Sequence, residues 1–217
     1  MGTQTLGIVP QFATPRWLRA VEPLAVFVLI MSYIWWLRYQ APYSWVPMLA
    51  LVLASHRLHQ ERAETLGFQR ANFRQCARDV LPALVLIVLT LLGTGILCRT
   101  IKPISFDQGL LSVIAYCPWG LFQQYLLNSY FVNRLAAFAP ERQVPAFSAA
   151  LFAGAHLPNP PLMLVTLLAG YASACIYLKY RNLYFLGVAH GVIGFLLYFT
   201  IPDSIIRNLN VGPGWFR

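Results

Sequence analysis

Five polar side chains that could take part in chemistry interrupt long runs of apolar residues in this chain. They are Gln123, Gln124, Asn128, His156 and His190. A polar side chain in a lipid environment costs free energy unless it finds a partner, so each of the five needs a structural or functional reason. Imidazole transfers protons near neutral pH, and an amide can orient a water molecule. These residue types therefore favour activation of water.

The depths of these side chains within their apolar segments are similar. At about 1.5 Å per helical residue, Gln124, His156 and His190 lie about 15, 21 and 14 Å from the arginine that ends their own segment. All three values fall within the middle part of a hydrocarbon core about 30 Å thick, His156 least centrally. We therefore expect the two histidines and the two glutamines to meet around one buried point.

The segment that carries the glutamines also places several residues on one helical face. Cys117, Leu121, Gln124 and Asn128 follow the i, i+4, i+7, i+11 pattern of such a face. Gln123 lies about 100° away around the helix axis. One interpretation is that the amides only hydrogen-bond to neighbouring helices, at about 0.6 kcal/mol each. The other is a polar site, and the similar depth of all five residues favours it.

A metal centre and a cysteine nucleophile are less favoured interpretations of these residues. Zinc prefers His, Cys, Asp or Glu ligands, and two histidines with neutral amides make a poor set. We therefore expect no metal and no cofactor. Nothing near Cys117 in the sequence would activate its thiol, so we interpret it as a packing residue.

The composition indicates which kind of protein must position these side chains. Of the 217 residues, 58% are apolar and only 11% are charged, against about 25% charged in an ordinary soluble domain. The mean hydropathy is +0.58. These values exclude a disordered chain, a soluble globular domain and a basic nucleic-acid-binding domain, and we expect no nucleic-acid partner. They predict an all-α fold, a polytopic helical membrane bundle of one domain, at residues 1–217.

Runs without charged residues define about seven transmembrane segments. They span residues 24–37, 43–55, 80–98, 110–133, 144–156, 161–178 and 183–201, and the second is short for a full crossing. We expect a multi-pass cell-membrane protein, in a bacterial inner membrane. Basic residues are more numerous on the side that would hold the N-terminus, so we expect a cytoplasmic N-terminus. If the second segment does not cross, the sides assigned downstream of it reverse. We expect the tail at 203–217 to lie at the surface.

Three short motifs, each on its own segment, resemble the signatures of the CPBP family of intramembrane proteases, also called Abi. This family includes CAAX prenyl endopeptidases and bacteriocin-processing enzymes, and its signatures are EExxxR, FxxxH and Hxxx(N/D), in this order. They stand here as QQYLLN at 123–128, FAGAH at 152–156 and HGVIG at 190–194. The resemblance covers roughly residues 64–200.

The resemblance implies which residues form the site. In the family, the first Glu and a His are thought to activate water against a scissile amide, and the third motif helps to hold the developing oxyanion. The implied catalytic residues are His156, His190, Gln123 and Gln124. The implied binding residues are Asn128, Phe152 and Asn159, the last within the Pro-Asn-Pro helix break that follows the second motif.

Three departures from the family pattern bear on mechanism. An amide at position 123 or 124 has no useful basicity and cannot take a proton from water. Asn128 stands where the family has an Arg, and Gly194 removes the Asn or Asp of the third motif. The seven acidic residues of the chain all fall at expected helix ends or in loops, so we expect none to replace the missing carboxylates. His156 then becomes the candidate base.

Three functional hypotheses follow from these observations. The first is an intramembrane peptidase with altered catalytic residues, acting on a membrane-associated peptide or protein in CAAX-type or bacteriocin-type processing. The second is a catalytically inactive relative that binds a membrane peptide or partner helix, in an immunity or assembly role. The third, a small transporter or channel, has little support because matching pairs of broken half-helices are missing from the sequence. The expected partners are a membrane-embedded peptide or protein and the lipid bilayer.

Overall fold

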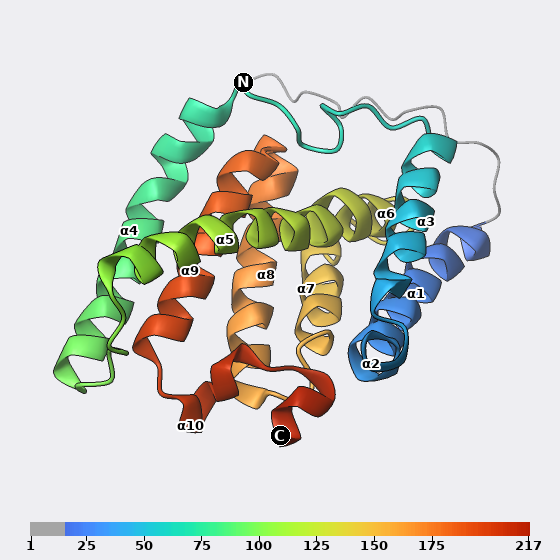
Figure 1. Cartoon of the computed structure of the whole chain (residues 1–217). Helices are drawn as coiled ribbons and strands as arrows, with labels where there is room; N and C mark the ends of the chain where they lie inside the picture. Colours follow the sequence, from blue (N-terminus) through green and yellow to red (C-terminus); the bar gives the residue numbers. More distant parts are fainter. Residues whose placement is uncertain (1–15) are drawn as a thin grey trace.

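The computed structural model of the protein describes residues 16–217, and within this range the regular structure is entirely helical, which confirms the predicted all-α fold class. The N-terminal part is a hairpin (Figure 1). α1 (Arg16–Ser32) continues through a π-helical stretch (Tyr33–Leu37) into α2 (Arg38–Gln40). After a short turn (Pro42–Ser44), α3 (Trp45–Leu58) returns beside α1.

The longer helices that follow form a bundle. α4 (Phe73–Leu97) packs against α9 (Leu183–Thr200), and α7 (Val144–Gly154) packs against α8 (Pro160–Tyr180). α5 (Phe106–Gln124) crosses α9 and runs across the view of Figure 1, whereas α7, α8 and α9 stand upright.

Shorter elements complete the chain. α5 continues without a break into the π-helical stretch η3 (Tyr125–Val132) and the single turn α6 (Asn133–Ala136). After α9 come α10 (Asp203–Ile206) and two 3₁₀ turns (Arg207–Leu209 and Gly212–Phe216), which lie at the lower end of the bundle in Figure 1.

All seven predicted segments coincide largely with helical structure, with ends that differ by up to eight residues. Four helical stretches are long and apolar enough to cross a membrane: Arg19–Gln40, Phe73–Leu97, Pro160–Tyr180 and Leu183–Thr200. The first of these contains the predicted segment 24–37 together with several residues on either side of it. That each of the other predicted segments also crosses remains a prediction.

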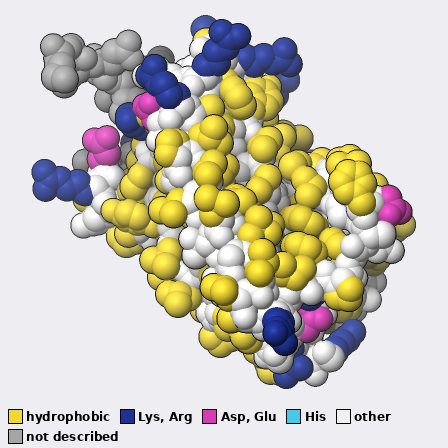
Figure 2. All heavy atoms as spheres, turned by 90° about the vertical axis from the view of Figure 1, so that its left-hand side faces the viewer, with side chains coloured by type: hydrophobic (Ala, Val, Ile, Leu, Met, Phe, Trp, Pro, Cys, Tyr) yellow, Lys and Arg dark blue, Asp and Glu magenta, His cyan; other side chains and the backbone are white. Residues whose placement is uncertain are grey.

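The outer surface of α4 has the character of a lipid-facing helix. Its exposed side chains include Leu81, Val85, Leu86, Leu89 and Ile96. Figure 2 shows hydrophobic side chains spread across this side of the molecule, with Lys and Arg side chains gathered toward its upper and lower ends. Contact between such an apolar surface and lipid hydrocarbon is favourable in free energy, whereas its contact with water is unfavourable.

Polar caps fix where the helices that carry the candidate site begin. At the start of α5, the Gln108 backbone N–H donates to Ser105 Oγ at 3.4 Å, and the Ser105 N–H donates to Gln108 Oε1 at 3.2 Å. Asn159 caps α8, which opens with two prolines. Asn182 caps α9 and accepts a hydrogen bond from the Phe185 N–H at 3.0 Å.

α5 and α9 cross with their backbones nearly in contact, because glycines lie at the crossing. A Cβ atom added to Gly120 would lie 2.7 Å from the carbonyl oxygen of Gly187, and one added to Gly191 would lie 2.8 Å from a Cα atom of α5. Gly187 and Gly191 have the spacing by which small residues let membrane helices approach closely. This approach brings His190, the residue before Gly191, to the end of α5 where Gln124 lies.

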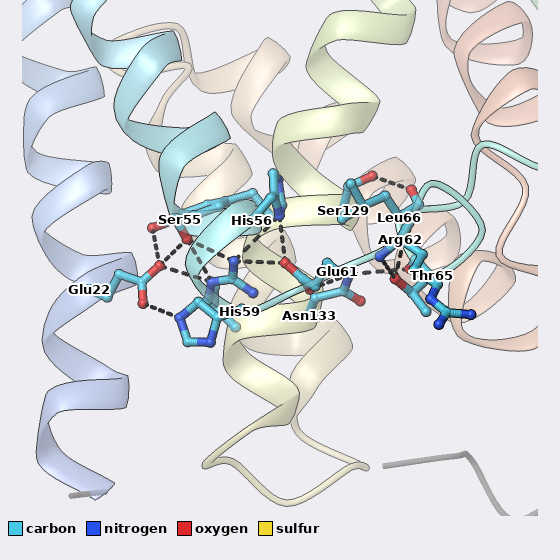
Figure 3. Close-up of polar contacts among 12 residues, drawn as sticks. Glu22, Ser55, His56, His59, Glu61, Arg62, Thr65, Leu66, Ser129 and Asn133 are labelled. Atoms are coloured by element: carbon cyan, nitrogen blue, oxygen red, sulfur yellow. Dashed lines mark hydrogen bonds and ion pairs between the residues drawn. The ribbon is translucent and has the colours of Figure 1, made fainter. Parts of the chain in front are cut away.

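A group of ion pairs joins the N-terminal hairpin to the bundle (Figure 3). We call this group the Arg134 cluster, and its members are Glu22, Ser55, His56, His59, Glu61 and Arg134. Arg134 Nε lies 2.9 Å from Glu22 Oε1, and Arg134 Nη2 lies 2.8 Å from Glu61 Oε2. The cluster therefore ties α1 and the loop after α3 to α6.

Two of the acidic residues do not lie at a helix end or in a loop, as was expected of them. Asp79 lies inside α4, at its seventh residue. Glu22 was expected at a helix end, but it lies inside α1, which begins at Arg16 and not at the start of the apolar run. Its pairing with Arg134 and with His59, 2.9 Å away, makes a helical position for this carboxylate acceptable. Glu61 lies in the loop between α3 and α4, as expected.

Candidate functional site

A cavity of about 1040 Å³ lies among the N-terminal hairpin, α4, α5 and the helices α7 to α9. Most of its lining side chains are apolar. Five of the seven site residues expected from the sequence line it: Gln123, Gln124, Phe152, His156 and His190. The structure therefore brings the two histidines and the two glutamines to one cavity.

His190 is held by Gln124. Gln124 Nε2 lies 2.9 Å from His190 Nδ1. The oxygen of the same amide, Oε1, accepts hydrogen bonds from Asn128 Nδ2 at 2.6 Å and from Ser173 Oγ at 2.5 Å. Because Oε1 is used by two donors, the amide N–H group is the one that points at the imidazole, and His190 Nδ1 must accept.

This contact decides the protonation of the neutral His190 ring. A neutral imidazole carries one proton, so a ring whose Nδ1 accepts a hydrogen bond carries that proton on Nε2. His190 therefore presents an Nε2–H donor.

His156 is hydrogen-bonded in the opposite sense. Its Nδ1 lies 2.7 Å from the carbonyl oxygen of Phe152, one helical turn earlier. A carbonyl only accepts, so Nδ1 carries the proton and Nε2 of the neutral ring keeps a free lone pair. His156 is therefore an acceptor where His190 is a donor.

The ring of Phe152 lies against both histidines. Its centroid is 4.8 Å from that of His156 and 5.9 Å from that of His190, with near edge-to-face geometry in both cases. This packing limits rotation of either imidazole. The Phe of the second motif thus packs against both histidines, and its predicted role in binding a substrate stays a prediction.

The two expected binding residues that do not line the cavity have structural partners. Asn128 is fully buried beneath Gln124 on the same helical face, as the sequence pattern predicted. Asn159 caps α8, and its Nδ2 donates to the carbonyl oxygens of Ile206 at 2.9 Å and Asn210 at 3.1 Å. These contacts hold the chain after α9 against the start of α8.

The tail lies largely at the surface, as expected, since only Ile206 and Gly212 among residues 203–217 are buried, but part of it also reaches the cavity. Leu209 and Val211 line the cavity, and the Gly212 N–H donates to the carbonyl oxygen of Leu157 at 2.7 Å. Arg38 Nη2 donates to the carbonyl oxygen of Val211 at 2.9 Å. Besides the local hydrogen bonds of its own turns, the tail is thus bonded to the turn that follows α7 and to α2.

Gly194, the last residue of the third motif, also lines the cavity. A Cβ atom added there would lie 3.3 Å from Cδ1 of Tyr116. The ring of Tyr116 on α5 thus lies where a larger side chain at position 194 would need room. Nothing at this position supplies the hydrogen-bonding side chain that the resemblance implies.

Ser173 belongs to the site although sequence reasoning did not single it out. It lies on α8, it lines the cavity and it bonds to both Gln124 and Asn128. Its only signal in the sequence is a hydroxyl within the otherwise apolar segment that follows the Pro-Asn-Pro break. Serine is common in such segments as a packing residue, so this signal is weak.

The cavity has no acidic lining. Among the residues of 16–217 that line it, none is Asp or Glu, whereas Arg38 is a lining residue. In the same range, no three His, Cys, Asp or Glu residues lie close enough together to hold a metal ion. The chemistry of the site therefore rests on imidazole and amide groups.

The two glutamates of the Arg134 cluster are already paired with Arg134. Burial raises the pKa of the Glu61 carboxyl, but hydrogen bonds from His56 and Arg134 and the charge of Arg134 outweigh burial and hold the pKa below its ordinary value of 4.5. Glu61 thus stays ionised and paired, and it does not act as a base for the cavity.

Comparison with known proteins identifies one family. The model of the family described as type II CAAX prenyl endopeptidase Rce1-like matches residues 81–196, which is more than half of the chain. The match includes both glutamines and both histidines of the cavity. Neither the curated proteins nor the solved structures contain a match to this chain.

Proposed function

The chain belongs to the family of type II CAAX prenyl endopeptidase Rce1-like proteins, and from this membership we propose that it hydrolyses a peptide bond with His156 as the base. It is a CAAX-type intramembrane peptidase-like protein, and its long apolar helices place it in a membrane. The family acts on membrane-associated substrates. The observation that carries the proposal is the opposite hydrogen bonding of the two cavity histidines.

The first step requires a base, and His156 supplies it. Its Nε2 lone pair accepts a proton from a water molecule while the water oxygen attacks the carbonyl carbon of the scissile amide. The C–N bond then breaks, and the His156 imidazolium returns the proton to the leaving amine. The ring ends in its starting state, and the added water is divided between the new carboxyl group and the amine.

The negative charge that develops on the carbonyl oxygen requires a donor, and His190 supplies it. Its Nε2–H is available because Gln124 occupies Nδ1. The Gln123 amide, which also lines the cavity, provides a second N–H donor or holds the attacking water. Gln124 holds His190 and does not itself orient the water, because its oxygen and one N–H are engaged within the protein.

The apolar lining supports a membrane-associated peptide or protein as the substrate. A cavity of about 1040 Å³ is at the upper end of the range, about 300–1,000 Å³, that is usual for small-molecule sites. Apolar side chains surround the polar groups, so a lipid-modified or hydrophobic peptide segment would bury its chain while its backbone meets the histidines.

The direct test is cleavage of a membrane-tethered peptide by the purified protein in lipid nanodiscs. His156→Ala should lower the rate about a hundredfold or more, because a positioned general base typically contributes that much. Phe147→Ala on α7, the helix that precedes His156, is the control, since Phe147 is 45% exposed and does not line the cavity. Equal rates for the parent and His156→Ala would refute the assigned role.

A second function, binding without hydrolysis, is favoured by the missing carboxylates. The cavity has polar groups and an apolar lining without any carboxylate, and both features suit a membrane peptide or a partner helix. In this case the parent protein retains a hydrophobic peptide but releases no product. Cleavage by a variant with glutamate at both glutamine positions distinguishes a peptidase from a protein that only binds.

A further inference from the structure

We propose that Arg38 is an anion-binding residue of the cavity and that it receives a carboxylate of the peptide bound there. Arg38 begins α2, at the turn of the N-terminal hairpin, and belongs to none of the three motifs. It lines the same cavity as His156 and His190. The proposal rests on the proposed function only in that the cavity takes a membrane peptide, and it holds whether or not that peptide is cleaved.

The guanidinium of Arg38 has donors that the protein does not use. Nη2 donates to the Tyr39 hydroxyl at 2.5 Å and to the carbonyl oxygen of Val211 at 2.9 Å. Nε is buried without a hydrogen-bond partner among residues 16–217. Nη1 forms no hydrogen bond with these residues either, and it is not one of the buried unpaired atoms. Because a guanidinium donates from all three nitrogens, Nη1 remains available to a ligand in the cavity.

The charge of Arg38 is also without an anionic partner. No carboxylate of residues 16–217 forms an ion pair with it. Asp203, the one acidic residue of the tail, pairs with Lys102 at 2.5 Å. The Tyr39 ring, 4.7 Å from Arg38 Cζ, compensates the charge only in part. A partly buried cation beside an apolar cavity therefore favours the binding of an anion.

The tail holds the guanidinium at a defined place. The peptide group between Val211 and Gly212 accepts from Arg38 Nη2 through its oxygen, and its N–H donates to the carbonyl oxygen of Leu157 at 2.7 Å. Gly212 has a φ of 60°, and a Cβ atom added to it would lie 2.9 Å from the carbonyl oxygen of Ile34. Glycine adopts such a φ at little cost, so this residue permits the close approach.

This peptide group also sets the distance from Arg38 to the histidines. Across it, Arg38 Nη2 lies no more than about 8 Å from the carbonyl oxygen of Leu157, the residue after His156. An extended peptide covers about 3.3–3.6 Å per residue. A peptide with a carboxylate at Arg38 would therefore bring a backbone amide to the histidines within a few residues.

These observations favour a peptide carboxylate over a lipid phosphate as the anion. Arg38 is partly buried, is bonded to the tail and lines the cavity together with both histidines. A peptide supplies an amide for the histidines and a carboxylate for Arg38 on one chain. The carboxylate can be the end of the chain or an Asp or Glu side chain, since both present the same pair of acceptor oxygens.

The measurement is the affinity of three fluorescent hydrophobic peptides for the full-length protein in nanodiscs of neutral phosphatidylcholine. The first peptide has a free C-terminal carboxylate, the second is the same peptide amidated, and the third is amidated but ends in glutamate. All proteins carry His156→Ala so that no peptide is consumed. The free acid should bind about tenfold more tightly than the amidated peptide, because a hydrogen bond to a charged group contributes that much. The third peptide reports whether a side-chain carboxylate is accepted as well.

Substitutions of Arg38 assign this preference to its charge. Arg38→Gln should abolish the preference and leave the affinity of the amidated peptide unchanged, which also shows that the variant is folded. Arg38→Lys keeps the charge and should retain most of the preference. Arg99→Gln is the matched control, because Arg99 is exposed, does not line the cavity and should have no effect. If Arg38→Gln binds neither peptide, the proposal requires that Arg38→Lys still distinguishes them.

Each result supports or overturns the proposal. Equal affinity of all three peptides for the protein with Arg38 would overturn it, and so would a preference that persists in Arg38→Gln. Equal peptide affinities together with Arg38-dependent binding of labelled phosphatidic acid would assign the site to a lipid phosphate instead. The expected preference in a protein that cleaves nothing with His156 restored would support Arg38 and count against the peptidase. Cleavage of the free acid and the amidated peptide with the same KM would do the reverse.

Discussion

Arg134 Nη2 lies 2.8 Å from Glu61 Oε2 and thereby joins α6 to the loop after α3, 73 residues away in the sequence. The same guanidinium holds Glu22 on α1. Arg134 is 5% exposed. The hairpin that forms one side of the cavity is therefore attached to the bundle through a buried charge.

Arg134→Ala should destabilise the protein by about 3 kcal/mol, because it leaves two partly buried carboxylates without their cation. Reversible unfolding in mixed micelles would measure the change. Arg70→Ala is the control, since Arg70 is an exposed arginine and should change stability by no more than about 0.5 kcal/mol. Adding Glu22→Gln and Glu61→Gln to Arg134→Ala should recover part of the loss. Equal stability of Arg134→Ala and Arg70→Ala would show that the cluster does not hold the hairpin.

Glu61 should make the stability of the protein depend on acid pH. Its pKa is lower in the folded protein than its ordinary value of 4.5, so the folded state binds the proton less readily than the unfolded state. The stabilisation is fully present above the unfolded pKa and is lost as the pH falls through the folded pKa. Unfolding measured across this acid range should show a weaker pH dependence in Glu61→Gln. An identical slope in both proteins would contradict this role.

The glycine crossing of α5 and α9 should not tolerate larger residues. Gly191→Val places two methyl groups where α5 backbone atoms already lie 2.8 Å from an added Cβ. The helices must separate, at a cost of about 1–3 kcal/mol, and His190 must move away from Gln124. Gly93→Ala on α4 is the matched control, because an added Cβ meets nothing within 4 Å there. Gly93→Ala should be neutral or stabilising, by up to about 1 kcal/mol. Loss of the Gln124–His190 contact in the NMR spectrum of Gly191→Val, but not of Gly93→Ala, is the expected outcome.

Glutamate at positions 123 and 124 should separate the peptidase from the binding protein. A carboxylate beside the histidines can take a proton from water, which an amide cannot do. If the parent binds without cleaving, the double variant Gln123→Glu/Gln124→Glu should gain peptide cleavage. If the parent cleaves, the variant should lose activity, because the carboxylate at position 124 has only acceptor atoms and would require the proton of His190 on Nδ1. Cleavage rates of both proteins on one tethered peptide give the answer, and the addition of His156→Ala to the double variant shows whether the new activity uses the same site.

The family and the helices could be predicted from the sequence because both depend on local patterns. Uncharged runs and caps such as Asn182 are properties of neighbouring residues, and they set where the helices lie. Three motifs on three segments were enough to indicate the family, and the match over residues 81–196 confirms it. Depth along each segment also predicted that Gln124 and His190 would lie near each other, as they do.

The arrangement around those residues depends on contacts that no local pattern contains. Depth does not fix the rotation of a helix about its axis, so the sequence could not show that Ser173 meets Gln124 across 49 residues. It also could not show that residues of the tail line the cavity, or that Arg134 forms ion pairs with carboxylates from two distant segments. The sequence by itself thus determined the helices, the family and the kinds of polar group in the site. Only the tertiary structure decided which histidine is the donor and which the acceptor, because a tautomer is set by the partner of the opposite ring nitrogen.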